Sequence, residues 1–545
     1  MRRNKFLGLD LSTQSLTALV LDLSDHSLYR KSLHFDETYP SYQTRGGVLA
    51  GEDPRVVCAD PRMWIEAVDD LLLLLRHEGI TKEVASLSVS AQQHGSVYLH
   101  SKAAVRLKDL DHRKPLAEQI GDIFARPVAP VWMDSSTSEE CEEIAQAMGG
   151  DARLAEITGS RATERFTGPQ IRKFWKKDPR AYEHTRHIAL ISSFITSLLT
   201  GRLAPVDCGD GFGTHLANIC TGKWSREALA ATAPRLRSML PRLVRGDESA
   251  GRVSPSLIKR YGFQPQTEVI VGTGDNPASL VGLGLVGDPQ RKAVSLGTSD
   301  TYFGYMRSLG RDRSPEGHVF GAADGKYMLL LCFKNGSLAR EAVKNRHHLS
   351  WDEFSRILLS TKPGNDGKIM LPYFLPEITP LVLNPKVHRF GGLLEKDAEG
   401  NVRAVVEGQI MSMCLHSAGF GTHPEKILVT AGGSENQGLL QTIADVFDAE
   451  VESFEVKDRA ALGAALRAAK GFLATKGDFR EWKALTEPFT RHRGLGIVRP
   501  RKEAVKIYRG GHGLLGVYAV CERSALGLGG DPQAAIRRFR KGYGS

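Results

Sequence analysis

Phe6 to Ser15 reads FLGLDLSTQS, and Ala293 to Thr301 reads AVSLGTSDT. In each stretch a short apolar run turns through small hydroxylated residues and then resumes as apolar sequence, which is typical of two strands joined by a tight turn. Successive backbone N–H groups in such a turn point to one side and suit the binding of phosphate oxygens. A single copy would more often be an ordinary hairpin. Two copies, one opening each half of the chain, predict a phosphate clamp between two domains.

The length of the chain predicts the same two halves. A single hydrophobic core stops growing at about 250–300 residues, and this chain has 545. In both halves β-rich runs alternate with helical patterns, such as those over Trp64–Arg76 and Gln437–Phe447, which is typical of α/β domains with a central sheet. We expect an N-terminal domain over residues 1–255 and a C-terminal domain over residues 256–520.

The positive charge of the chain is concentrated at its C-terminal end. The net charge is +10 and the pI is near 9.1, which alone would suggest a nucleic-acid, membrane or phosphate partner. Residues 491–545 contain twelve Lys or Arg and three Asp or Glu, so this segment carries +9 and the preceding 490 residues are nearly neutral. We therefore expect no nucleic-acid or membrane partner, and a flexible basic tail over residues 521–545.

Cysteine usage and hydropathy predict a soluble, cytoplasmic protein. The seven cysteines are widely separated and never form Cys-x-x-Cys, which supports neither a disulfide framework nor a zinc ribbon. The basic start at Met1–Lys5 resembles a signal peptide, but Asp10 interrupts the apolar stretch that follows. The longest apolar stretches are shorter than the ~20 residues that a membrane-spanning helix needs.

A carboxylate stands where a strand passes into a helix. The apolar run VIVGTG at Val269–Gly274 precedes Asp275, Asn276 and Pro277, and an apolar helical run follows. Ligands of α/β sheets gather at the carboxyl ends of strands, and we expect Asn276 to cap the helix with Pro277 at its first position. The positive end of that helix favours an ionised Asp275. By position alone, Asp275 is equally a functional carboxylate or an additional cap.

Two familiar nucleotide-binding signatures are not supported. Gly282–Gly287 matches Gly-x-Gly-x-x-Gly, but it lies inside the helical run instead of opening a helix after a strand. The P-loop pattern Gly-x-x-x-x-Gly-Lys-Ser/Thr does not occur in the sequence. We therefore expect neither a dinucleotide-binding fold nor a P-loop.

A polar loop between two β-type runs suits a polyhydroxylated ligand. Ala91–Gly95 reads AQQHG, in which two amides and the imidazole of His94 form a dense set of donors and acceptors. A loop histidine satisfied by the backbone is the more common arrangement. Further along, Arg165 in the stretch ERFTG either contacts a ligand or pairs with Glu164 at the surface.

A glycine pair marks a third candidate site. Thr430–Asn436 reads TAGGSEN, follows the apolar strand Ile427–Val429 and opens the helix predicted from Gln437. Paired glycines allow the backbone to approach a flat ligand, and a helix N-terminus favours an anion. The alternative is a plain loop with Ser434 as the N-cap. Downstream, the small residues of Ala460–Ala465 predict a helix face for close packing.

Taken in order along the chain, these stretches resemble the FGGY carbohydrate kinases, and among them the xylulose kinases of animals. The resemblance implies two actin-like ATPase (ribonuclease H-like) domains of α/β class with a cleft between them, the N-terminal one on the sugar side and the C-terminal one on the nucleotide side. It implies a requirement for ATP and Mg²⁺ and transfer of the γ-phosphate to the 5-hydroxyl of D-xylulose. The matching stretches are LGLDLSTQSLTALVLD from Leu7, SAQQHGSVY from Ser90, PVWMDSST from Pro130, ERFTG from Glu164, GDNPASL from Gly274, AVSLGTSDT from Ala293, LLCFKNGSL from Leu330 and ADVFDA from Ala444.

The resemblance also implies a role for individual residues. Asp275 would accept the proton of the sugar hydroxyl, and His94, Arg165 and Asn276 would hold the sugar beside it. Asp10 would lie near the phosphates and, indirectly, the metal ion. The residues implied on the nucleotide side are Asp10, Thr13, Gly297, Thr298, Trp351, Gly432, Gly433 and Asn436. The partners implied are a small sugar and ATP, with the protein a monomer or a homodimer.

Two alternative functions remain open at this point. One is an FGGY kinase for another ketose or polyol, such as ribulose or glycerol, and the other is a non-catalytic actin-like module that binds nucleotide. Ser12 and Gln93 stand where many bacterial relatives have glycine and methionine. These departures agree with the animal-type pattern, and the carboxylate at Asp275 argues against a pure nucleotide sensor.

Overall fold

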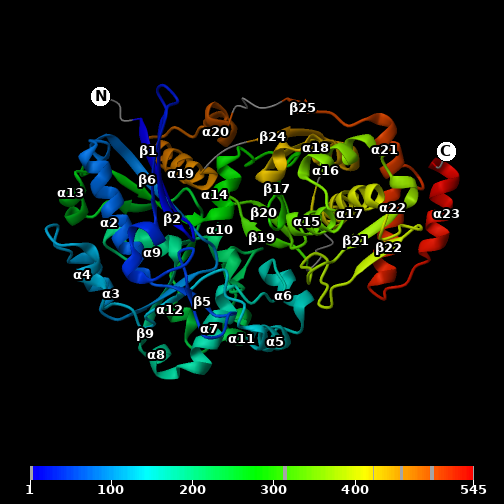
Figure 1. The fold of residues 1–545 in the computed structure, drawn as a ribbon. Helices are drawn as coiled ribbons and strands as arrows, with labels where there is room; N and C mark the ends of the chain where they lie inside the picture. Colours follow the sequence, from blue (N-terminus) through cyan, green and yellow to red (C-terminus); the bar gives the residue numbers. More distant parts are fainter. Residues whose placement is uncertain (1–3, 311–315, 422, 455–457, 491–495, 544–545) are drawn as a thin grey trace. The chain divides into compact units, whose positions relative to one another are not determined.

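The computed structural model describes residues 4–310, 316–421, 423–454, 458–490 and 496–543 (Figure 1). The chain divides into two units, each of them discontinuous in sequence. The chain first crosses from unit 1 to unit 2 between residues 287 and 288, whereas the sequence predicted a boundary between residues 255 and 256. The boundary lies later because the strands that follow residue 255 still join the sheet of unit 1. Unit 1 is Met1–Gly287, His318–Met328 and Lys457–Arg491, and unit 2 is Asp288–Gly317, Leu329–Val456 and His492–Ser545.

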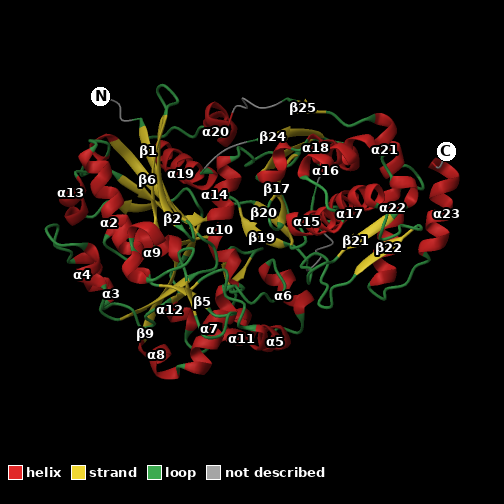
Figure 2. Ribbon diagram, viewed as in Figure 1, coloured by secondary structure: helices red, strands yellow, loops and turns green. Residues whose placement is uncertain are grey.

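The central sheet of unit 1 has the strand order β14-β15-β6-β1-β2-β3, and β16 also pairs with β6. Its strands β1, β2 and β6 are labelled among the yellow strands in Figure 2. β1, β2 and β3 form an antiparallel meander, whereas β6 runs parallel to β1, and β15 and β16 run parallel to β6. β1 and β6 are almost wholly buried, as expected of strands with helices on both faces. The strands are β1 (Lys5–Leu11), β2 (Ser15–Asp22), β3 (Leu28–His34), β6 (Val84–Ala91), β14 (Ser249–Arg252), β15 (Glu268–Ile270) and β16 (Thr273–Gly274).

One face of this sheet is covered by a helix from far along the chain. α19 (Arg459–Thr475) lies against β1 and β6, so the orange helix in Figure 1 stands beside the blue strands. The close approach depends on Gly8, where a Cβ would lie 2.1 Å from the carbonyl oxygen of Ala461. Leu7 and Leu9 belong to the hydrophobic core that also contains Trp64 of α2 (Pro61–His77).

The sheet of unit 2 repeats the plan of unit 1. The strands that unit 2 contributes follow the order β20-β18-β17-β23-β24-β25, in which β17 and β18 form an antiparallel hairpin and β23 and β24 continue parallel to β17. The stretches Phe6–Ser15 and Ala293–Thr301 are therefore corresponding hairpins, β1–β2 and β17–β18, and the predicted internal repeat is confirmed. The strands are β17 (Arg291–Leu296), β18 (Asp300–Met306), β20 (Tyr327–Phe333), β23 (Lys426–Thr430), β24 (Glu450–Ser453) and β25 (Ile497–Val498).

The remaining elements surround these sheets. The further helices of unit 1 are α1 (Phe35–Thr38), α3 (Ala103–Lys108), α4 (Leu116–Ile120), α5 (Ser138–Ala147), α6 (Asp151–Thr158), α7 (Thr167–Lys177), α8 (Pro179–His184), α9 (Ile191–Thr200), α10 (Cys208–Gly211), α11 (Arg226–Thr232), α12 (Leu236–Met239), α13 (Pro255–Tyr261), α14 (Asp275–Gly282) and α20 (Trp482–Thr490). Its short strands are β4 (Leu49–Ala50), β5 (Val57–Ala59), β7 (Ser96–His100), β8 (Ala129–Pro130), β9 (Thr185–Leu190), β10 (Val206–Asp207), β11 (Ala217–Asn218), β12 (Lys223–Trp224), β13 (Leu243–Val244) and β19 (His318–Gly321). Unit 2 adds α15 (Ser337–Arg346), α16 (Trp351–Ser360), α17 (Ala398–Ser417), α18 (Gln437–Phe447), α21 (Lys502–Arg509), α22 (Leu514–Ala525), α23 (Pro532–Tyr543), β21 (Ile369–Pro372) and β22 (Val387–Phe390). Within the described ranges, no helix is both long and apolar enough to cross a bilayer.

The basic C-terminal segment is helical, in contrast to the predicted flexible tail. α23 buries Ala535, Ile536 and Phe539 against unit 2. The guanidinium of Arg540 donates to the carbonyl oxygens of Asp366 at 2.9 Å and Gly391 at 2.6 Å. The first two basic residues of the 491–545 segment, at positions 491 and 493, lie outside the described residues.

Candidate functional site

Two predicted carboxylates of unit 1 lie at the carboxyl ends of neighbouring strands. Asp10 stands near the end of β1 opposite Ser90 of the parallel strand β6, and Ser90 Oγ donates to Asp10 Oδ1 over 2.7 Å. β16, which also pairs with β6, leads directly into Asp275. Burial, together with the negative charges of Asp275 and Asp458, raises the pKa of Asp10 to about 7. Parallel strands thus bring Asp10 and Asp275 to one edge of the sheet.

The helix that carries Asp275 begins earlier than the sequence predicted. We expected Asn276 to be the N-cap and Pro277 the first helical residue. α14 instead begins at Asp275, with Gly274 as its N-cap and no side-chain cap. Gly274 is still extended as the last residue of β16, so strand and helix adjoin without a loop. The predicted capping role of Asn276 is therefore wrong, and the carboxylate belongs to the first helical turn.

The carboxylate of Asp275 is held by its neighbours in the ionised form. Oδ1 accepts hydrogen bonds from the backbone nitrogen of Asn276 at 2.8 Å and from its Nδ2 at 3.1 Å. Burial raises the pKa of Asp275 to about 6, and the backbone N–H groups of Asn276 and Gln93 limit that rise. The side chain is half-buried. Asp275 is therefore mostly ionised at neutral pH, while its basicity exceeds that of an ordinary aspartate.

Gln93, one of the two amides of the AQQHG loop, lies beside Asn276. Its Oε1 accepts a hydrogen bond from Asn276 Nδ2 at 2.9 Å, and its backbone N–H stabilises the carboxylate of Asp275. A Cβ on Gly274 would lie 2.2 Å from Gln93 Cγ, so the glycine allows this contact. Gln93 thus connects the AQQHG loop to the Asp275–Asn276 pair. The adjacency of Gln93 to His94 was the signal that pointed to it.

His94 and Arg165 meet around the buried ring of Phe166. The imidazole of His94 stacks on Phe166 with ring centroids 4.0 Å apart, and the rings of His215 and His318 lie 4.2 and 5.2 Å from Phe166. Arg165 Nη2 lies 3.4 Å from His318 Nε2. The structure thus brings the two predicted sugar-binding residues together. Phe166, His215 and His318 were not predicted. The position of His318 depends on β19 returning to unit 1.

The histidines of this cluster are neutral. Burial and the charge of Arg165 hold the pKa of His94 and of His318 well below the ordinary value. His94 Nδ1 lies 2.7 Å from the carbonyl oxygen of Gly213, which can only accept, so Nδ1 carries the proton and Nε2 is the acceptor. The backbone of His94 is left-handed, with φ of 70°. The backbone thus satisfies Nδ1, as expected of a loop histidine, and the contact of Nε2 with a ligand stays a prediction.

Thr13 lies in the first hairpin turn and is bonded on two sides. Trp132 Nε1 donates to Thr13 Oγ1 at 2.8 Å, and Thr13 Oγ1 lies 3.4 Å from Gln92 Oε1. Trp132 remains 41% exposed. The hydroxyl group of Thr13 therefore connects the first hairpin turn to the AQQHG loop and to the stretch PVWMDSST.

In unit 2 the second hairpin turn exposes its hydroxyl groups. Gly297, Thr298 and Ser299 join β17 to β18, and Leu296 pairs with Asp300 across the turn. Thr298 and Ser299 are exposed, whereas Asp300 is buried. The turn predicted from the sequence is confirmed, and the exposed Thr298 and Ser299 are accessible to an anion.

The other predicted nucleotide-binding residues gather on one side of unit 2. Gly433 lies against Leu296, beside the turn, where a Cβ would approach Leu296 Cβ to 2.7 Å.

Asn436 caps α18 by accepting from Leu439 N at 3.1 Å, and its Nδ2 donates to Ser355 Oγ at 2.7 Å. Ser355 lies one turn after Trp351, the first residue of α16, whose side chain is 46% exposed. Asn436, and not Ser434, is thus the cap. Nothing lies within 4 Å of a Cβ placed on Gly432, so the glycine pair faces open space on that side.

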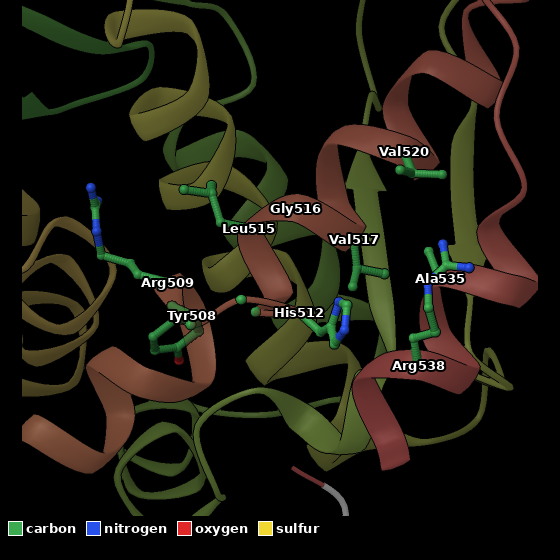
Figure 3. Close-up of a pocket in the computed structure, with 12 residues that line it drawn as sticks. Tyr508, Arg509, His512, Leu515, Gly516, Val517, Val520, Ala535 and Arg538 are labelled. Carbon is green, nitrogen blue, oxygen red and sulfur yellow. The ribbon is translucent and has the colours of Figure 1, made fainter. Parts of the chain in front are cut away.

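Unit 2 also contains a cavity of about 410 Å³ that lies between α21, α22 and α23 (Figure 3). His512 and Arg538 line it together with Val517, Val520 and Ala535. The guanidinium of Arg509 points away and donates to the carbonyl oxygen of Val446 at 3.1 Å. No predicted site residue lines this cavity, so it is separate from the group around the hairpin turn.

The chain matches two domain models of one protein family. The model described as the N-terminal domain of the FGGY family of carbohydrate kinases matches residues 124–282. The model of the C-terminal domain of the same family matches residues 293–472. Asp275 lies in the first match, and Gly297, Gly432 and Asn436 lie in the second.

Similar curated proteins cover most of the chain. The xylulose kinase of Rattus norvegicus is 40% identical over 482 residues, which cover 86% of this chain and 89% of the relative. Xylulose kinase 2 of Arabidopsis thaliana is 40% identical over 492 residues, covering 86% and 88%. The predicted resemblance to xylulose kinases is confirmed at this level of identity.

Solved structures share the fold over nearly the whole chain. The xylulose kinase of Rhodospirillum rubrum superposes with a TM-score of 0.78 at 18% identity, covering 96% of this chain and 99% of that one. A gluconate kinase of Lactobacillus acidophilus gives the same TM-score at 19% identity, covering 96% and 98%. The predicted two-domain actin-like fold is confirmed. Since the two structures are named for different sugars, the fold alone does not determine the substrate.

Proposed function

We propose that this chain, which belongs to the FGGY family of carbohydrate kinases, transfers the γ-phosphate of ATP to the 5-hydroxyl of D-xylulose. The observation that carries the proposal is the position of Asp275, a half-buried carboxylate in the first turn of α14. Its identity as a sugar kinase for D-xylulose is supported by relatives of that name at 40% identity.

Asp275 acts as the base of the proposed reaction. Its pKa of about 6 leaves it ionised at neutral pH, and Asn276 and Gln93 hold the carboxylate in place. It accepts the proton of the sugar hydroxyl while the oxygen attacks the γ-phosphorus. Phosphoryl transfer has a loose transition state, so positioning and charge neutralisation dominate and a weak base is sufficient. A base of this kind contributes about 10²–10⁴-fold to the rate.

His94 and Arg165 hold the sugar in this proposal. The Nε2 atom of His94 accepts a hydrogen bond from a sugar hydroxyl, because Nδ1 is already committed to Gly213. Arg165 supplies guanidinium donors from the other side of the Phe166 cluster. Buried neutral imidazoles around an apolar ring provide the mixed polar and apolar lining that sugar sites use.

The nucleotide lies on unit 2 in this proposal. Gly297 and Thr298 bind the γ-phosphate through the exposed hairpin turn. In unit 1, Thr13 of the corresponding turn and Asp10 of β1 are the residues proposed to bind the phosphates. Gly432 and Gly433 approach the nucleoside, with Trp351 and Asn436 beside them on α16 and α18.

Asp10 fits a hydrated Mg²⁺ ion. Mg²⁺ usually keeps several waters and binds one or two carboxylates together with substrate phosphates. Among the described residues no three His, Cys, Asp or Glu side chains form a metal-binding group, so the protein contributes a carboxylate and not a complete set of ligands. Asp10 lies at a strand end with Oδ1 bonded to Ser90, and would hold the ion through its water shell. When bound there, the ion would neutralise charge on the phosphates.

Buried thiols support a reducing compartment such as the cytoplasm. Cys58, Cys141, Cys414 and Cys521 are buried and form no disulfide bond. Burial raises the pKa of the Cys521 thiol to about 12, so it stays protonated and unreactive.

A sugar panel tests the proposed function. ADP release is measured with ATP and D-xylulose, D-ribulose, glycerol or D-gluconate, and the product is identified by ³¹P NMR. We expect kcat/KM for D-xylulose to exceed the others by at least about 10²-fold, since a missing or misplaced hydroxyl leaves buried polar groups unpaired. A preference for another sugar would overturn the substrate. Nucleotide binding without any sugar-dependent ADP release would favour the non-catalytic module.

A further inference from the structure

A buried ion pair lies directly behind the hairpin turn of unit 2. Asp300, the first residue of β18, is 1% exposed and Arg340 of α15 is 3% exposed. Two hydrogen bonds join them, Arg340 Nη1 to Asp300 Oδ2 at 2.7 Å and Nη2 to Oδ1 at 3.0 Å. This is the bidentate arrangement in which an arginine fixes both the position and the plane of a carboxylate.

The burial of this pair is not explained by stability alone. Removing two charges from water is costly, and well-packed apolar residues in place of such pairs are often equally stable or more stable. Burial raises the pKa of Asp300, and Arg340 opposes that rise. A pair retained at this cost points to a requirement for a defined geometry nearby.

Asp300 fixes the end of the turn that leads into β18. The carboxylate is stabilised by the backbone N–H of Gly297, at the opposite end of the three-residue turn. Asp300 therefore joins the two ends of the segment that contains Thr298. Because Arg340 holds both carboxylate oxygens, the turn cannot rotate about β18 without breaking a buried ion pair.

The residues at the start of α15 hold Gly297 and Thr298 of the turn. Ser337 N donates to Gly297 O at 2.9 Å. Gly336 lies so close that a Cβ there would be 2.7 Å from the carbonyl oxygen of Thr298 and 2.7 Å from the nitrogen of Asp300. Any shift of the Gly336–Ser337 backbone is therefore transmitted to Thr298.

Gln409 connects the Arg340–Asp300 pair to Gly336. Arg340 Nη1 also donates to Gln409 Oε1 at 3.0 Å, and Gln409 Nε2 donates to the carbonyl oxygen of Gly336 at 2.8 Å. Gln409 lies on α17 and is buried. Arg340 thus controls Asp300 directly and Gly336 through Gln409, so both supports of the turn depend on one guanidinium.

We propose that Arg340 is a positioning residue that holds the Gly297–Ser299 turn in the geometry that binds the γ-phosphate. The inference rests on the proposed function, in which Thr298 and Gly297 face that phosphate. Arg340 touches neither substrate. It acts through Asp300 on one side and through Gln409 and Gly336 on the other.

The variant Arg340→Lys tests this role, because lysine keeps the positive charge but loses the bidentate geometry. We expect kcat to fall by about 10²-fold, the effect of an ångström-scale misplacement of reacting groups. Calorimetry should show weaker binding of the non-hydrolysable analogue AMP-PNP, by about tenfold for a lost phosphate hydrogen bond, with ADP affinity unchanged. KM for the sugar should also remain unchanged, since the sugar-binding residues lie on unit 1.

Arg260→Lys is the matched control. Arg260 and Asp69 of unit 1 form a similarly bidentate pair, at 2.6 and 2.8 Å, away from all predicted site residues. This variant should lower thermal stability without altering kcat or the preference for AMP-PNP over ADP. Equal losses of AMP-PNP and ADP affinity in Arg340→Lys would overturn the proposal, as would wild-type values for both.

Gln409→Leu provides a second test if Arg340→Lys does not fold. It removes the connection to Gly336 without changing any charge, and leaves the Arg340–Asp300 pair in place. The proposal predicts the same selective loss of AMP-PNP affinity, of smaller size. Unchanged AMP-PNP affinity in a folded Gln409→Leu variant would contradict it. The binding measurements need no sugar, so they remain decisive even if the sugar panel overturns the substrate.

Discussion

Nδ2 of Asn276 lies 2.9 Å from Oε1 of Gln93, and the same Asn276 also donates to the carboxylate of Asp275. The AQQHG loop therefore orients the amide that sits beside the proposed base. The loop and the base come from β6 and α14, which are separated by more than 180 residues of sequence.

Gln93→Met should impair this arrangement without disturbing the fold. Methionine has similar length but offers no comparable acceptor, so the Asn276 amide loses its partner. We expect kcat to fall by about tenfold, the value of one hydrogen bond in the transition state, with Tm within about 2 °C of wild type. Steady-state kinetics and a thermal melt measure both. An unchanged kcat would show that Gln93 has no role in orienting Asn276.

The variant His94→Asn should distinguish the roles of the two imidazole nitrogens. The Asn Nδ2 can replace Nδ1 as donor to Gly213, and asparagine tolerates the left-handed backbone at this position. The variant lacks an acceptor in the place of Nε2. We expect KM for the sugar to rise by about 10-fold or more, while KM for ATP stays unchanged.

His94→Ala is the comparison for that variant. It loses both nitrogens and places a residue that disfavours positive φ at a left-handed position, so it should also lower Tm. Equal sugar KM in His94→Asn and wild type would exclude Nε2 as a sugar contact.

The pH dependence of kcat/KM should show an acid limb near pH 6. Burial raises the pKa of Asp275 to about 6, and only the ionised form accepts a proton. Activity should therefore be full above that pKa and fall about tenfold per pH unit below it. A limb near pH 4, the range of an ordinary aspartate, would contradict the buried environment. The profile is measured at saturating ATP with limiting sugar.

Gly463→Ala should destabilise the contact that supports α14. A Cβ at Gly463 of α19 would lie 1.8 Å from the carbonyl oxygen of Ala278. This oxygen belongs to the backbone of α14, so it cannot shift without distorting the helix. We expect a loss of about 3 kcal/mol, which corresponds to roughly 4 °C in Tm for a unit of more than 300 residues.

Gly516→Ala is the matched control within a helix. Nothing lies within 4 Å of a Cβ at Gly516 of α22, and alanine is favoured over glycine in helices by up to ~1 kcal/mol. Its Tm should equal or exceed that of wild type. A Gly463→Ala variant as stable as Gly516→Ala would mean that α19 and α14 pack less closely than the structure shows.

Features that depend on neighbouring residues could be predicted from the sequence. The hairpin turns after β1 and β17 follow from small hydroxylated residues between apolar runs, and both occur where predicted. α18 spans Gln437–Phe447 as predicted, because its apolar stripe has helical period. The bare face of Ala460–Ala465 also packs closely, as Gly463 does against Ala278.

Features that depend on contacts between distant segments could not be predicted from the sequence. Nothing in the local pattern of Arg459–Thr475 indicates that this helix returns to cover β1, since the contact depends on Gly8 more than 400 residues earlier. For the same reason the grouping of His318 with Phe166 was missed. In the basic C-terminal segment the glycines suggested a tail, whereas Ala535, Ile536 and Phe539 already had the spacing of a buried helical face.

The most direct test of the account compares Asp275→Asn with the wild type in two measurements on the same sample. Asparagine preserves the shape of the side chain but cannot accept the proton. Calorimetry with D-xylulose should give a Kd within about threefold of wild type, while kcat with saturating ATP and D-xylulose falls by about 10²–10⁴-fold. Near-wild-type turnover in this variant would contradict the role of Asp275 as the base.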